Sequence, residues 1–162
     1  MSLIMQIVKS DYKTELEKNG VIAFVPAGNS MWPIIKNKKQ SVIVKSKTER
    51  LTPNAVAFYL RPTGVFVLHR VIEVLDNGYL CCGDSQLDTE VVLEDWVFGV
   101  MDGFYQGKKY ISVNDNSYIK MVEKWYKNPV RRERKIKSFY FWQRVKNKLK
   151  RIFNSNKEDE NV

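Results

Sequence analysis

Three side chains able to carry out acyl transfer occur in order along the chain. Ser30 lies in the segment GNSMWP at 28–33, and His69, the only histidine, follows in VLHRV at 67–71. The segment GDSQLD at 83–88 then supplies carboxylates. A serine hydroxyl, an imidazole and a carboxylate together are the groups of serine hydrolysis.

The surroundings of Ser30 suit a nucleophile. Gly28 precedes it by two positions and Pro33 follows by three, so a tight turn can expose the hydroxyl and direct backbone amides at one point. A serine between a turn and a strand also commonly serves as a turn or cap residue. A serine nucleophile needs a base within hydrogen-bond reach, and His69 is the only imidazole that the chain offers.

The third group is less well defined. Asp84 and Asp88 are both candidates to hold the second nitrogen of His69 and to offset the charge that the imidazole gains. Asp84 can equally cap a turn, and His69 can be a core residue of an apolar strand.

These strings resemble the signal-peptidase and self-cleaving-repressor superfamily of serine endopeptidases, over about residues 21–103. Gly-x-Ser-Met-x-Pro, His-Arg-Val after a strand and Gly-Asp followed by a second aspartate are similar to the histidine-base branch, which includes the endoplasmic-reticulum and archaeal signal peptidases. The resemblance implies Ser30 as nucleophile, His69 as base and Asp84, slightly preferred to Asp88, as the orienting group. It also implies an oxyanion site in the turn of Gly28, Asn29 and Ser30, chiefly the amide of Ser30, and a peptide bound extended beside residues 21–25.

The chain departs from the family pattern at three places. Residues 54–57 read Asn-Ala-Val-Ala where relatives carry Gly-Asp-Ile-Val, and Gly28 stands where bacterial signal peptidases place a serine hydroxyl. The apolar run at 3–8 is too short to span a bilayer and lacks the features of a secretory signal, so we expect no membrane anchor. The chain thus resembles the small anchorless bacterial members, which implies a peptide or pre-protein substrate in the cytoplasm.

Composition agrees with a cytoplasmic globular protein. Hydrophobic residues make up 44% and charged residues 28% of the chain, which is ordinary for a soluble domain. Cys81 and Cys82 are adjacent, a spacing that disfavours a mutual disulfide and fits a reducing compartment. The sequence gives no sign of a metal or organic cofactor.

The pattern of elements predicts a mainly β fold with helices at both ends. A short helix is expected at 10–20, and short apolar runs separated by turn residues predict a coiled antiparallel sheet or barrel. Its strands are expected near 21–25, 41–44, 55–59, 65–68, 71–74, 79–82 and 96–100. We expect a peptidase domain at 1–115, helices at 116–127 and 131–153 separated by Asn128-Pro129, and a disordered end at 154–162.

The basic charge is confined to the C-terminal part. Residues 124–162 contain 13 Lys or Arg and 4 Asp or Glu, whereas residues 1–123 contain 14 of each. Apolar residues recur there at three- and four-residue steps among cations: Ile136, Phe139, Trp142, Val145, Leu149 and Ile152. This helix can pack on the domain, lie on an anionic membrane surface or contact nucleic acid, and the aromatic run at 139–142 favours a membrane over nucleic acid.

Two functions of different classes remain. The first is a serine endopeptidase that cleaves a peptide or pre-protein. The second is a catalytically weak or inactive module that binds or regulates and is recruited to a membrane or nucleic acid by its basic tail. Retention of all three polar side chains favours catalysis.

Overall fold

A computed structural model describes residues 12–159 of the chain, with side chains to residue 151. The start of the helix predicted at 10–20 therefore lies outside the described residues. The chain divides into two compact units, Met1–Val122 and Glu123–Val162, and each is described by itself. Among the described residues, no helix is both long and apolar enough to cross a membrane.

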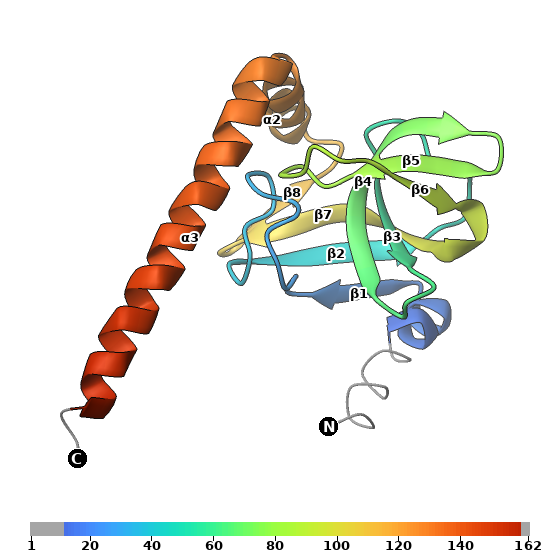
Figure 1. Ribbon diagram of the computed structural model, residues 1–162. Helices are drawn as coiled ribbons and strands as arrows, with labels where there is room; N and C mark the ends of the chain where they lie inside the picture. The colour runs from blue at the N-terminus through green and yellow to red at the C-terminus, as the bar shows by residue number, and fades with distance from the viewer. Residues whose placement is uncertain (1–11, 160–162) are drawn as a thin grey trace. The chain divides into compact units, whose positions relative to one another are not determined.

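The first unit is built on one antiparallel sheet (Figure 1). Its strands run in the order β1-β2-β7-β3-β4-β5-β6, with β8 added beside β7, and the path does not close on itself. The predicted mainly β class is thus confirmed, as an open sheet rather than a barrel. The strands are β1 Val21–Phe24, β2 Gln40–Ser46, β3 Val56–Leu60, β4 Phe66–Leu75, β5 Gly78–Cys82, β6 Glu90–Leu93, β7 Val97–Gln106 and β8 Lys109–Ser112.

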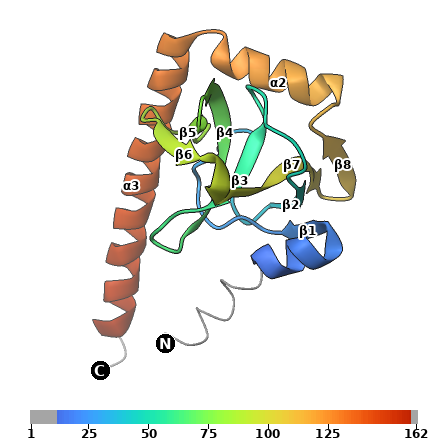
Figure 2. The same cartoon turned by 90° about the vertical axis from the view of Figure 1, so that its right-hand side faces the viewer.

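The central strands β3, β4 and β5 form the scaffold of the site (Figure 2). A two-residue turn before Gly78 joins β4 to β5, as the Asp-Asn-Gly sequence predicts. Because side chains alternate along a strand, Val67, His69 and Val71 share one face of β4. Val67 and Val71 belong to a buried apolar cluster with Ala57, Tyr59, Tyr79, Cys81, Val92 and others.

Helices lie at both ends of the described chain. Residues 12–19 are helical, and Gly20 ends this helix at a φ of 72° with its N–H donated to the Leu16 carbonyl. Near the other end lie α2, Asn116–Tyr126, and α3, Pro129–Asp159. The Asn128 side chain caps α3 by accepting a hydrogen bond from the N–H of Arg131 at 2.9 Å.

The length of α3 differs from the expectation. The sequence predicted its end near 153 and disorder from 154, whereas the helix continues to Asp159 and residues 160–162 lie outside the description. Because residues 153–159 contain neither glycine nor proline, nothing in the backbone chemistry terminates the helix there.

Candidate active site

Ser30 lies in a turn after β1, at the point where the chain leaves the edge of the sheet. Gly28 adopts a φ of 116°, a conformation that side-chain-bearing residues rarely occupy. The turn is closed by the N–H of Trp32, which donates to the Asn29 carbonyl at 3.0 Å. Ser30 itself is half-buried.

The segment that follows β5 holds the Ser30 turn by donating hydrogen bonds to backbone carbonyls of that turn. The N–H of Ser85 donates to the Ser30 carbonyl at 2.8 Å, and the Ser85 hydroxyl donates to the Asn29 carbonyl at 2.6 Å and to that of Ser30 at 3.2 Å. A Cβ at Gly83 would lie 2.7 Å from the Ser30 carbonyl oxygen, so the close approach requires glycine. Ser30 is therefore fixed to the segment that follows β5. The strand β5 in turn pairs with β4, the strand that carries His69.

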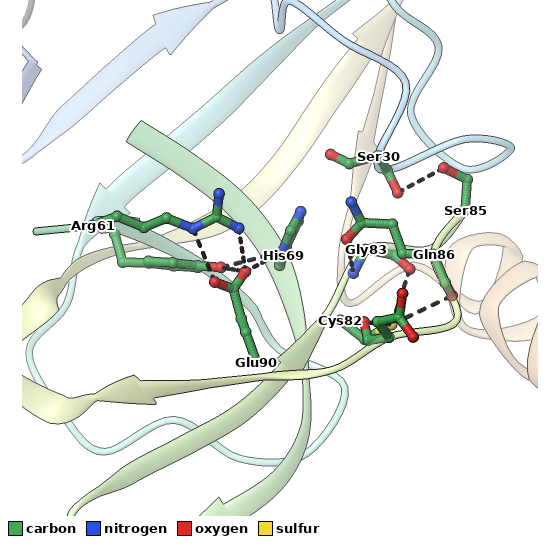
Figure 3. A network of polar contacts seen from close by, with 10 residues as sticks. Ser30, Arg61, His69, Cys82, Gly83, Ser85, Gln86 and Glu90 are labelled. Atoms are coloured by element: carbon green, nitrogen blue, oxygen red, sulfur yellow. Dashed lines mark hydrogen bonds and ion pairs between the residues drawn. The ribbon is translucent and has the colours of Figure 1, made fainter. Parts of the chain in front are cut away.

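His69 occupies the middle of β4 and is only 3% exposed. It pairs across the sheet with Ala57, which places Tyr59, two residues further along β3, diagonally beside the imidazole. The His69 Nδ1 atom lies 2.8 Å from Glu90 Oε1 and 3.1 Å from the Tyr59 hydroxyl. In the view of Figure 3, His69 lies between Glu90 and Ser30.

Glu90 reaches His69 from the first position of β6. Its strand partner is Cys81 of β5, so its side chain shares the face of the apolar cluster to which Cys81 belongs. Arg61 donates from Nε to Oε2 at 2.9 Å and from Nη2 to Oε1 at 2.7 Å, and the Tyr59 hydroxyl also donates to Oε1. Four donors therefore position one carboxylate (Figure 3).

These contacts determine the protonation of the site. Burial alone would raise the pKa of Glu90, but the hydrogen bonds from Arg61 and Tyr59 outweigh burial and lower that pKa. The ionised carboxylate can only accept, so we assign the proton of neutral His69 to Nδ1, which leaves Nε2 with a free lone pair. Burial lowers the pKa of His69, and Glu90 opposes that shift only in part.

Asp84, the favoured orienting group from sequence, has a different partner. Its two carboxylate oxygens accept from Arg70 Nε and Nη2, each at 2.7 Å, and neither side chain has exposed surface. Arg70 Nη1 also donates to the Asn54 carbonyl at 2.8 Å and to the Tyr118 hydroxyl at 3.1 Å. Asp84 is thus half of a buried ion pair.

The carboxylate at His69 is therefore that of Glu90, and not that of Asp84 or Asp88, the two candidates from the sequence. Asp88 is exposed, and its backbone carbonyl accepts the Cys82 thiol at 3.3 Å. A signal for Glu90 was present, since it is an acidic residue that opens an apolar strand. The position of Glu90 opposite Cys81, however, depends on the pairing register of β5 and β6, which no local sequence motif specifies.

The site contains the groups of a hydrogen-bonded acid–base pair beside a serine-bearing turn. Within the described part of the chain, no three His, Cys, Asp or Glu side chains gather as a metal site would require. Comparison of the chain with protein-family models, curated proteins and solved structures found no match.

Proposed function

We propose that the protein is a serine endopeptidase of the signal-peptidase-like type that cleaves a peptide or pre-protein. The observation that carries the proposal is the hydrogen bond of 2.8 Å between His69 Nδ1 and the Glu90 carboxylate. It holds the imidazole with Nε2 as acceptor, the form that a general base must have. The resemblance of the Ser30 turn to the family nucleophile supports the same assignment.

The reaction follows from these groups. His69 Nε2 takes the Ser30 hydroxyl proton while the Ser30 oxygen bonds to the substrate carbonyl carbon, and the amide of Ser30 stabilises the oxyanion. Collapse of this intermediate breaks the peptide bond, and His69 returns the proton to the leaving amine. Water, deprotonated by His69, then bonds to the acyl carbon, and collapse breaks the bond to the Ser30 oxygen, which takes the proton back from His69. Glu90 offsets the positive charge on His69 in both steps.

We place this activity in the cytoplasm. Cys81 and Cys82 are adjacent and buried, a spacing that disfavours a mutual disulfide and fits a reducing compartment. Burial raises the pKa of Cys81 to about 12, so its thiol stays protonated and unreactive at neutral pH. From the cytoplasm the protein can also take a peripheral position at the inner face of a membrane.

Two parallel assays on the full chain test the proposal. Intact mass after treatment with a fluorophosphonate probe should show one adduct on the wild type, lost in Ser30→Ala and in His69→Ala and kept in Ser117→Ala, which changes an exposed serine of α2. Digestion of a peptide library should show cleavage by the wild type and Ser117→Ala only, with small residues near the cut.

The outcomes separate the two classes of function. A probe adduct that persists in Ser30→Ala would contradict the assignment of the nucleophile. Peptide cleavage by the wild type no greater than by Ser30→Ala would overturn the enzyme and favour a binding or regulatory module on the same scaffold. Circular dichroism of each variant establishes that it folds.

A further inference from the structure

The apolar residues of α3 do not form one face. Ile136 and Val145 are separated by about two and a half turns at ~3.6 residues per turn, so they lie on opposite sides of the helix. Ile136 is 4% exposed, whereas Trp142 is 63% and Leu149 50% exposed. The apolar residues that recur along this helix therefore lie on two sides of it, with Ile136 buried on one side and Trp142 and Leu149 exposed on the other.

The apolar residues on the side away from Ile136 are here called the outer stripe: Phe141, Trp142, Val145 and Leu149. Phe141 is 54% exposed, and its ring contacts that of Trp142 edge-on at a centroid distance of 5.6 Å. Val145 is half-buried. Large aromatic and aliphatic side chains gathered this way on an exposed helix mark an interaction surface.

Cations border the outer stripe on both sides. Residues 134–157 contain nine Lys or Arg and neither Asp nor Glu. The flanking cations are all exposed: Arg144, Lys146, Lys148, Lys150 and Arg151. Arg144 and Lys148, and Lys146 and Lys150, are spaced four apart, where like charges destabilise a helix. An anionic partner would remove that repulsion.

We propose that the outer stripe binds the surface of an anionic phospholipid bilayer. In that arrangement α3 lies parallel to the surface, its aromatic rings enter the headgroup boundary, and the flanking cations meet lipid phosphates and carboxylates. The inference is independent of the peptidase proposal, because no residue of the candidate active site takes part.

The exposed apolar side chains and the flanking cations disfavour two other binding partners for the outer stripe. A nucleic-acid backbone would satisfy the cations but leave Trp142 and Leu149 in water. A second copy could pair through the three- and four-residue spacing of the stripe, but this spacing covers fewer than the three or four heptads that sustain a coiled coil, and the flanking cations of two copies would repel.

Sedimentation of the full chain with vesicles tests the proposal. Phosphatidylcholine vesicles with about one third phosphatidylserine should bind the wild type, and pure phosphatidylcholine vesicles should bind it at least about tenfold more weakly. Trp142→Gln with Leu149→Gln should weaken anionic-vesicle binding about tenfold or more, because the apolar contribution is lost. Val130→Gln, which changes a 74% exposed α3 residue outside the stripe, should bind as the wild type does.

Other results would overturn the proposal. These are absence of binding to anionic vesicles, equal binding to both vesicle types, or binding unaffected by the stripe substitutions. Tighter binding to duplex DNA than to anionic vesicles would identify a nucleic-acid surface instead. In lipid-free analytical centrifugation, a dimer that disappears with Trp142→Gln and Leu149→Gln would identify a second copy as the occupant.

Discussion

At the scale of single residues, His69 is subject to opposing influences. Burial lowers its pKa, Glu90 raises it, Arg61 lowers it and Asp84 raises it. Arg61 and His69 both bind the Glu90 carboxylate, so the negative charge of Glu90 is shared between two partners. The site thereby holds the imidazole as a neutral base near neutral pH and still stabilises its charged form when it accepts a proton.

Replacement of Glu90 by glutamine should reduce peptidase turnover by about 100-fold to 10,000-fold, the range that follows from losing the charge and tautomer control of a triad carboxylate. The measurement is kcat/KM on a peptide found by library digestion. Asp88→Asn removes an exposed carboxylate nearby in sequence and should leave turnover unchanged. The reverse order of sensitivity would reassign the orienting group to Asp88.

Replacement of Arg61 by glutamine should raise the pKa of His69, since a nearby positive charge is removed. Activity requires neutral His69 and falls as pH drops through its pKa, so the acid limb of kcat/KM should move to higher pH. Because His69 is the only histidine, an NMR titration of untagged protein reports its pKa without assignment. Lys108→Gln, an exposed cation elsewhere, is the control, and an unmoved or lower pKa in Arg61→Gln would contradict this electrostatic account.

At the scale of elements, strand register decides which parts of the site could be predicted. Ser30 and His69 are identifiable because each lies in a short local string, and the β4–β5 hairpin because Asp-Asn-Gly encodes its turn. Glu90 could not be assigned from sequence, since its contact with His69 needs β5 to lie between β4 and β6 and needs Cys81 opposite Glu90. Asp84 was misassigned because a motif does not show that a neighbouring arginine binds it.

The ion pair between Asp84 and Arg70 joins the segment after β5 to β4. Asp84→Asn should lower the free energy of unfolding by about 3–5 kcal/mol, because it leaves the guanidinium of Arg70 buried without its counter-charge. Urea denaturation measures this loss. Glu17→Gln, in the exposed pair with Lys13, should cost less than about 1 kcal/mol. A stable but inactive Asp84→Asn would instead assign Asp84 a part in the chemistry.

At the scale of the whole molecule, the two units differ in what the sequence reveals. The helices α2 and α3 follow from periodicity and from the break at Pro129, yet the sequence pattern alone does not show that the apolar residues of α3 lie on two sides. Steps of three residues drift around a helix of ~3.6 residues per turn, so the apolar positions rotate from the side of Ile136 to that of Leu149. In the first unit, by contrast, a single buried histidine links the stability of the fold to pH.

The stability of the protein should therefore fall as pH drops below neutrality. The pKa of His69 is lowered in the folded state, so between the unfolded value of about 6.5 and the folded value the unfolded chain binds more protons, and acid favours unfolding. The lowered pKa of Glu90 acts in the same direction at more acid pH. Urea midpoints of the wild type should decrease from pH 7.5 to 5.5, and those of His69→Gln should decrease less. Equal slopes in the two proteins would show that His69 titrates alike in the folded and unfolded chain, and would contradict the account in which burial outweighs Glu90 at His69.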